Sequence, residues 1–184
     1  MNALADENVG KYLNTHFVSS YQKVSTFRIA NGQKQGGNVA GYFCTPDGQV
    51  LHVIAGPVGA DLFLREARWV IETHKLAVLE KRHRRHDLQE FFRRAHAERL
   101  NYDFGVEYVT PTPRTKRGSS ADPAALLAQP HYRTLPRQGL VHSLLAAPGS
   151  WDIQQLYRVV FERILGEKIS TLPVARASAP ITRR

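Results

Sequence analysis

The stretch from residue 40 to residue 73 constrains the fold more than any other part of the chain. It reads AGYFCTPDGQVLHVIAGPVGADLFLREARWVIET, which is an apolar run, a short polar interruption, a second apolar run and a longer mixed segment. In the interruption, Pro46 has the φ angle that a tight turn needs at its first central position, and Gly48 can adopt the left-handed conformation that closes a hairpin loop. The stretch therefore predicts a β-hairpin followed by a helix from about Asp61.

The same turn predicts the register of the hairpin. Cys44 is expected opposite Val50 and Tyr42 opposite His52, so that all four side chains share one face of the hairpin. Both faces are largely apolar, which indicates a sheet that is covered on both sides. The helix that follows has an apolar stripe at helical spacing and is the first candidate to cover one face. The members of that stripe are Phe63, Ala67 and Val70.

Upstream of the hairpin we expect a helix, a strand and a loop. Asp6 is a suitable N-cap for a helix that begins after it. Residues 17–24, with the sequence FVSSYQKV, predict a strand, and the glycine-rich residues 31–38 predict a loop. Downstream, residues 61–100 contain no Gly or Pro. We expect one helix that continues through the charged residues 80–87 and bends there; the alternative is a second helix that restarts at Asp87.

The C-terminal half divides into a linker, a helical segment and a tail. We assign residues 1–100 to the main domain, 101–138 to a linker, 139–170 to a helical segment and 171–184 to a disordered basic tail. Asp152 and Gly166 suit the two ends of the main helix in that segment. Its apolar stripe is expected to bind the main domain, a second copy or another protein. The stripe consists of Ile153, Leu156, Tyr157, Val160, Phe161 and Ile164.

The net charge of +9 is concentrated at the C-terminal end, where residues 111–184 hold 11 Lys/Arg and 4 Asp/Glu. Basic side chains near phosphates release counterions, so nucleic-acid binding is one hypothesis. A solvated basic surface is the alternative. The candidate polyanion-binding residues lie in and after the long helix, and they are Lys81, Arg82, Arg84, Arg85, Arg93 and Arg94.

Three strings of the chain resemble the thioredoxin-like fold family. They are VGKYLNTHFVSSYQKV, GYFCTPDGQVLHVIAG and FLREARWVIE, and the resemblance, closest to bacterial members, covers about residues 5–75. It implies an α/β three-layer sandwich with an incomplete N-terminal part, extended by a long basic helix and a C-terminal helical appendage. The family's Cys-x-x-Cys motif would lie upstream of about residue 4, and residues 36–40 hold no counterpart of its cis-proline. No catalytic residue of the family can therefore be carried over.

Cys44 is the single cysteine, which rules out an internal disulfide. The predicted register places it diagonal to His52, which suggests a reactive thiol with a histidine base. The alternative is a buried cysteine that packs as a small apolar side chain. His83 and His86 have helical spacing for a metal, but the surrounding positive charges would repel a cation. We therefore expect no metal and no cofactor.

The leading functional hypothesis is a non-catalytic thioredoxin-like module that binds or scaffolds other proteins. The first alternative is a thiol-disulfide oxidoreductase whose Cys-x-x-Cys segment is missing from this chain, and the second is nucleic-acid binding. The sequence holds no redox motif and no other recognisable set of catalytic residues. A protein without enzymatic activity is therefore the favoured interpretation. The start of the chain has no signal-peptide pattern, and no run of about 18 apolar residues occurs. These features predict a cytoplasmic protein without a membrane span.

Overall fold

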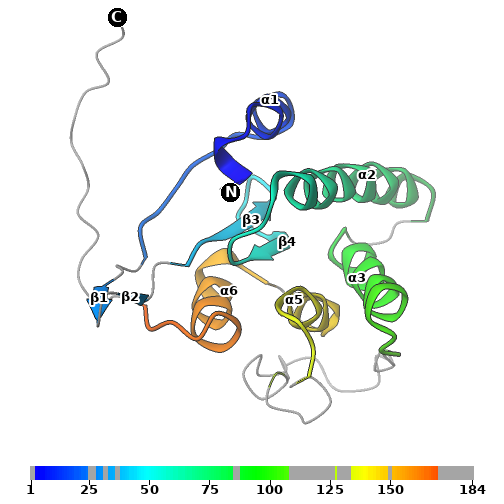
Figure 1. The fold of residues 1–184 in the computed structure, drawn as a ribbon. Helices are drawn as coiled ribbons and strands as arrows, with labels where there is room; N and C mark the ends of the chain where they lie inside the picture. Colours follow the sequence, from blue (N-terminus) through cyan, green and yellow to red (C-terminus); the bar gives the residue numbers. More distant parts are fainter. Residues whose placement is uncertain are drawn as a thin grey trace, which may run out of the picture.

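The computed structural model is a mixed α/β structure in which a two-stranded hairpin lies between two groups of helices (Figure 1). It describes residues 3–24, 28–30, 33–35, 38–84, 88–107, 127, 134–148 and 151–169. The elements are η1 (Ala3–Ala5), α1 (Glu7–His16), β1 (Arg28–Ala30), β2 (Gln33–Gln35), β3 (Ala40–Cys44), β4 (Val50–Ala55), α2 (Ala60–Arg84), α3 (Leu88–Phe104), α5 (Arg137–Ala146), α6 (Ile153–Val159) and the π-helical turn η3 (Val160–Ile164).

The central hairpin forms at the predicted turn but with a different register. Gly48 has a φ of 86°, which confirms the left-handed closure, and Cys44 lies opposite Val50 as expected. The next pair is Phe43 with His52, so Leu51 is left out of the pairing and forms a β-bulge. Because one extra residue reverses the alternation of side chains, the predicted Tyr42–His52 pair is wrong: Tyr42 lies opposite Val53.

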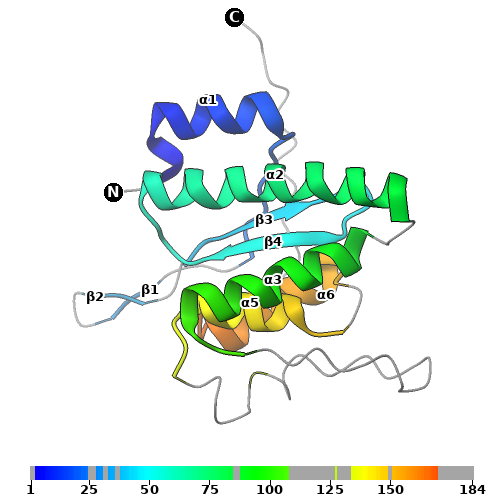
Figure 2. The ribbon, with the colours of Figure 1, turned by 90° about the vertical axis from the view of Figure 1, so that its right-hand side faces the viewer.

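The bulge gives the hairpin two different apolar faces, each covered by helices. One face packs against α1 and α2, and the other packs against α5, α6 and η3 (Figures 1 and 2). The first core contains the predicted stripe of α2 and is made of Ala3, Val9, Phe43, Leu51, Ile54, Phe63, Ala67, Val70 and Phe92. The second contains Val50, Val53 and Ala55 of β4 together with C-terminal residues. The expectation of a sheet covered on both faces is confirmed.

The helical region after the hairpin consists of two helices rather than one bent helix. α2 ends at Arg84 and α3 begins at Leu88, so the alternative of a restart near Asp87 describes the chain better. α3 runs back past α2 and lies between it and α5 (Figures 1 and 2). Because α3 runs back along the domain, its residues Leu88 and Phe92 reach the first core. A single unbroken helix over residues 61–100 would be too long for a domain of this size to cover.

Two expectations upstream of the hairpin are wrong. Residues 17–24 form no strand, and β2, which pairs with β1, lies inside the region 31–38 predicted as a glycine-rich loop. The predicted first helix is confirmed as α1, and the Asp6 carboxylate accepts hydrogen bonds from the backbone N–H groups of Asn8 and Val9. None of the described helices is long and apolar enough to cross a membrane.

The C-terminal helices pack on the hairpin of their own chain. The Asp152 carboxylate caps the N-terminus of α6, and Gly166 follows η3 with a φ of 70°, both as predicted. The backbone N–H of Val50 donates to the carbonyl of Trp151 at 2.8 Å, which ties β4 to the start of this segment. The stripe proposed for a partner is largely occupied, because Leu156, Val160, Phe161 and Ile164 are buried in the second core.

Leu156 tests this intramolecular packing. Its side chain is 0% exposed, so replacing it with alanine should lower the free energy of unfolding by about 2–5 kcal/mol. The matched control is Leu76→Ala in α2, where the side chain is 58% exposed and the loss should stay within about 0.5 kcal/mol. Urea denaturation at two protein concentrations would measure both. A Leu156→Ala effect that appears only at the higher concentration would contradict packing within one chain.

Candidate functional site

The outer edge of β4 is closed by side chains from two helices that are far away in the sequence. His96 of α3 donates from Nε2 to the carbonyl of Leu51 at 2.8 Å. Gln138 of α5 donates from its side-chain amide to the carbonyl of Val53 at 3.0 Å. Both carbonyls point away from β3 and would otherwise be buried without a partner. The helices therefore complete the hydrogen bonding of the sheet edge.

Three buried histidines meet at this edge. They are His52 of β4, His96 of α3 and His142 of α5, and each is 0% exposed. The ring centroids of His52 lie 5.4 Å from those of the other two, which are 5.0 Å from one another. Each ring offers one nitrogen, and these nitrogens all lie within 4.8 Å of one another. The fold thus gathers three imidazoles from three different elements.

A buried carboxylate supports the histidine cluster from the side of α2. Glu66 accepts a hydrogen bond from His52 Nε2 at 3.0 Å. Its two oxygens also receive the guanidinium of Arg99, at 2.6 and 3.0 Å. Arg99 in turn donates to Asp103 at 3.0 Å and lies 4.9 Å from the ring centre of Trp69. Glu66 is thus neutralised and oriented by two donors, as a buried charge requires.

The hydrogen bonds fix which nitrogens of two histidines carry the proton. His52 Nε2 faces the Glu66 carboxylate and His96 Nε2 faces a carbonyl, so both must be N–H donors. In the neutral rings, Nδ1 of His52 and Nδ1 of His96 therefore carry no proton, and each offers a lone pair to a donor. His96 Nδ1 lies 2.8 Å from Nδ1 of His142. His52 Nδ1 and His142 Nε2 are buried without a hydrogen-bond partner.

Burial lowers the pKa of all three histidines, since a charged imidazole would lose its hydration. The pKa of His96 falls to about 3, and the positive charge of Arg99 adds to the lowering at each ring. Burial acts to raise the pKa of Glu66, but the hydrogen bonds from His52 and Arg99 outweigh it and lower that pKa to about 2. At neutral pH the cluster is therefore three neutral imidazoles beside an ionised, paired carboxylate.

These pKa shifts predict acid sensitivity. An unfolded chain takes up protons on its histidines below about pH 6.5, whereas the folded cluster does not, so stability should fall as the pH drops from 6.5 towards 4.5. The slope approaches about 1.4 kcal/mol per pH unit for each histidine that stays neutral. The stabilisation that Glu66 contributes is present above its unfolded pKa near 4.5 and is lost below it.

Chemical denaturation with EDTA present at several pH values would measure this slope. His142→Leu should make the slope shallower, because it removes one titrating ring. The exposed His16 provides the control, since His16→Ala should leave the slope unchanged. A flat stability between pH 7 and pH 5 in the unmodified protein would contradict the assignment.

Sequence reasoning missed this cluster because 44 and 46 residues separate its three members. A signal was nevertheless present in α3. Phe92, His96 and Leu100 follow one another at four-residue spacing, and all three are buried. A histidine on the apolar stripe of a helix indicates a ring that must find its partners inside the protein.

The proposed Cys44–His52 pair is not formed. Because of the bulge, His52 shares a face with Phe43, whereas Cys44 packs on the opposite face against the second core. Burial, together with the nearby charge of Asp152, raises the pKa of the Cys44 thiol to about 11. The thiol is therefore protonated at neutral pH, and His52 is not beside it.

Alkylation of Cys44 by iodoacetamide would test this environment. At pH 8 the folded protein should react about two orders of magnitude more slowly than the urea-unfolded chain, because only the thiolate attacks. His52→Gln keeps a polar side chain at that position and should leave the folded rate unchanged, unless it unfolds the protein, which circular dichroism would show. A folded rate equal to the unfolded rate would contradict the raised pKa.

The predicted polyanion-binding residues fall into two groups. Lys81, Arg82, Arg84 and Arg85 have side chains outside the part of the chain that the structure describes, as do His83 and His86. Arg93 donates from Nε to Glu90 at 3.0 Å, and Arg94 donates to Glu80 at 2.8 Å. These two guanidinium groups are already paired within the protein.

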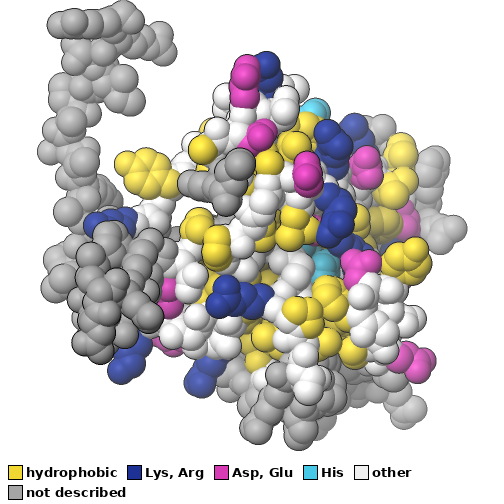
Figure 3. All heavy atoms as spheres, viewed as in Figure 1, with side chains coloured by type: hydrophobic (Ala, Val, Ile, Leu, Met, Phe, Trp, Pro, Cys, Tyr) yellow, Lys and Arg dark blue, Asp and Glu magenta, His cyan; other side chains and the backbone are white. Residues whose placement is uncertain are grey.

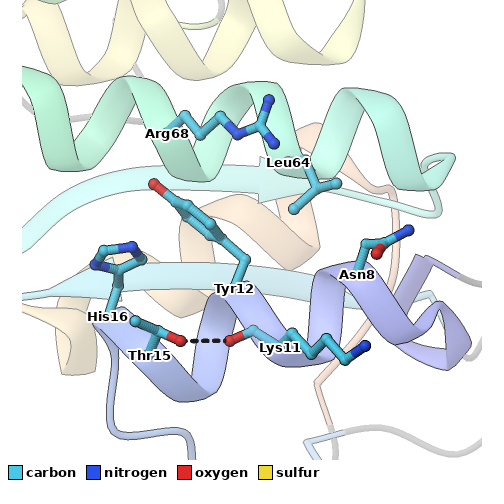
Figure 4. Close-up of a pocket in the computed structure, with 7 residues that line it drawn as sticks. All are labelled: Asn8, Lys11, Tyr12, Thr15, His16, Leu64 and Arg68. Atoms are coloured by element: carbon cyan, nitrogen blue, oxygen red, sulfur yellow. Dashed lines mark hydrogen bonds between the residues drawn. The ribbon is translucent and has the colours of Figure 1, made fainter.

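A separate hollow of about 410 Å³ lies between α1 and α2, away from the three buried histidines (Figure 4). Tyr12 and Arg68 face one another across it, with the guanidinium 5.7 Å from the ring centre. Lys11 also lines the hollow and forms an ion pair with Glu7 at 2.7 Å. The hollow is open and shallow, and no group in it has the buried, constrained position of the cluster residues.

The opposite edge of the hairpin, along β3, is built differently. The carbonyl of Val53 points away from β3, so the pair Tyr42–Val53 is of the non-hydrogen-bonded kind, and the N–H and C=O of Tyr42 point away from β4. The same holds for Ala40. Among the described residues, no backbone group or side chain hydrogen-bonds to these outward groups. Hydrophobic side chains reach the surface over this part of the molecule (Figure 3).

Comparisons with protein-family models, with curated proteins and with solved structures give no match. The two edges of the hairpin are therefore the structural features that bear on the function of the protein.

Proposed function

We propose that the protein is a non-catalytic binding module that captures an extended segment of a partner protein by strand addition to β3. The observation that carries this proposal is the contrast between the two edges of the hairpin. The edge of β4 is closed by His96 and Gln138, whereas no residue in the described part of the chain hydrogen-bonds to the outward N–H and C=O groups of β3. β3 has the sequence AGYFC, without charge or proline to discourage pairing, and such edges attract additional strands.

The segment after α1 adds apolar surface beside this edge. Phe17 packs on Phe43 at 5.2 Å between ring centres, and Val24 packs against the second core on the other face. The residues between them pass from one face of the hairpin to the other, on the side of β3 (Figure 1). Val18 and Tyr21 in this stretch are almost fully exposed, at 103% and 97%. They supply contacts for alternate side chains of an incoming strand.

The charge around the edge favours an acidic partner segment. Residues 8–46 hold four Lys/Arg and no Asp/Glu, although Lys11 is paired with Glu7 and a Glu167 oxygen accepts from the N–H of Asn38 just before β3. An extended peptide with acidic side chains would be attracted to this region, while the same region of a second copy would be repelled. The occupant that fits best is therefore an acidic, β-prone segment of another protein.

The proposal agrees with the resemblance to thioredoxin-like proteins. A strand added to β3 would enlarge the hairpin towards the wider sheet of a three-layer sandwich, between the same two groups of helices. The protonated thiol of Cys44, which has no histidine beside it, supports a role in binding rather than in thiol exchange.

Selection of displayed ten-residue peptides on the immobilised full chain would test the proposal. Recovered peptides should combine alternating β-branched or aromatic residues with Asp or Glu, and added salt should weaken their binding. Tyr42→Pro removes the outward N–H without removing a bond of the β3–β4 pair, and affinity should fall about tenfold or more. Tyr42→Val is the matched control: it retains the N–H and should change affinity far less.

Two outcomes would contradict strand addition. The first is equal affinity of the selected peptides for Tyr42→Pro and Tyr42→Val, with both variants folded by circular dichroism. The second is undiminished binding of peptides whose backbone is N-methylated at alternate positions in both possible registers, since those peptides cannot form the ladder.

A further inference from the structure

We propose that His52, His96 and His142 form a binding site for one divalent transition-metal ion of the zinc class. The site lies at the closed edge of the hairpin and is independent of strand addition at β3. It joins β4, α3 and α5, which are three elements that no disulfide connects.

The nitrogen positions are close to those that such an ion needs. A tetrahedral zinc with bonds of about 2.0–2.1 Å holds its nitrogen ligands about 3.3 Å apart. His96 Nδ1 and His142 Nδ1 are 2.8 Å apart, and one nitrogen from each of the three rings lies within 4.8 Å of the others. Small rotations of the three rings would bring these nitrogens to a common distance from one ion.

The outer hydrogen bonds are those that orient metal-binding histidines. Such rings commonly donate their second N–H to a carboxylate or a backbone carbonyl, which directs the other nitrogen at the metal. His52 donates to Glu66 and His96 donates to the carbonyl of Leu51. The nitrogen left on each is Nδ1, and that of His52 is buried without a partner. A bound cation would satisfy this nitrogen, which protein hydrogen bonds leave unsatisfied.

The chemistry of the donors selects the class of ion. Three imidazole nitrogens without a coordinating carboxylate suit Zn²⁺, Co²⁺, Ni²⁺ or Cu²⁺ and exclude the oxygen-preferring Mg²⁺ and Ca²⁺. Three protein ligands leave a fourth position for water or a small anion. The charges around the rings balance, because Glu66 and Asp103 are paired with Arg99, and Arg65 also reaches Glu66 from the surface at 3.7 Å.

Cobalt titration of the full-length, chelator-treated protein would test the site. One equivalent of Co²⁺ should give the intense visible bands of a tetrahedral ion, and Zn²⁺ should displace it. Glu66→Gln keeps the shape of the side chain but removes the charge that faces both His52 and Arg99, and it should weaken Co²⁺ binding by about 10–100-fold. His142→Ala should abolish the bands. His16→Ala removes an exposed histidine and should leave them unchanged.

A second measurement covers the case in which His142→Ala does not fold. In the unmodified protein, nitrogen NMR of the imidazoles should show that Zn²⁺ shifts a ring-nitrogen resonance of each of the three buried histidines at one equivalent. Absence of tetrahedral bands, or zinc-induced shifts confined to exposed histidines such as His16, would overturn the proposal. So would a folded His142→Ala variant that retains the wild-type Co²⁺ affinity.

Discussion

The closure of one edge of a two-stranded sheet organises the rest of this structure. A hairpin buried between helices has carbonyl groups along each edge that must be hydrogen-bonded or face water. Along β4 the chain solves this with side chains, because Leu51 and Val53 are reached by His96 and Gln138. The solution brings the His96 imidazole into the interior beside His52, whose own partner is Glu66, and Arg99 in turn pairs with Glu66.

Much of the local structure could be predicted from the sequence because it depends on short-range chemistry. The Pro46–Gly48 turn, the Asp6 and Asp152 caps and the apolar stripe of α2 all involve residues within a few positions of one another. The failures involve relations that no local pattern encodes. A bulge at Leu51 reversed the faces of the hairpin and separated Cys44 from His52.

The candidate metal site also depends on contacts between residues that are far apart in the sequence. His52 and His96 each looked unremarkable, one in an apolar strand and the other in a helix of ordinary composition. Their meeting depends on α3 turning back after residue 84 and on α5 returning to the hairpin after a long connection. Residues 17–24 are the converse case: their composition is typical of a strand, yet they form no ladder with β3, although they pass on its side of the hairpin.

The bond between the N–H of Val50 and the carbonyl of Trp151 also bears on how the chain acquires its structure during synthesis. One hundred and one residues separate the two groups, so the hairpin is made early and acquires its second core late. Contacts of such long sequence separation slow folding, because a large loop must close first. Until the last helices leave the ribosome, one apolar face of a nearly complete hairpin is open to water, and this interval is when a nascent chain would most need a chaperone.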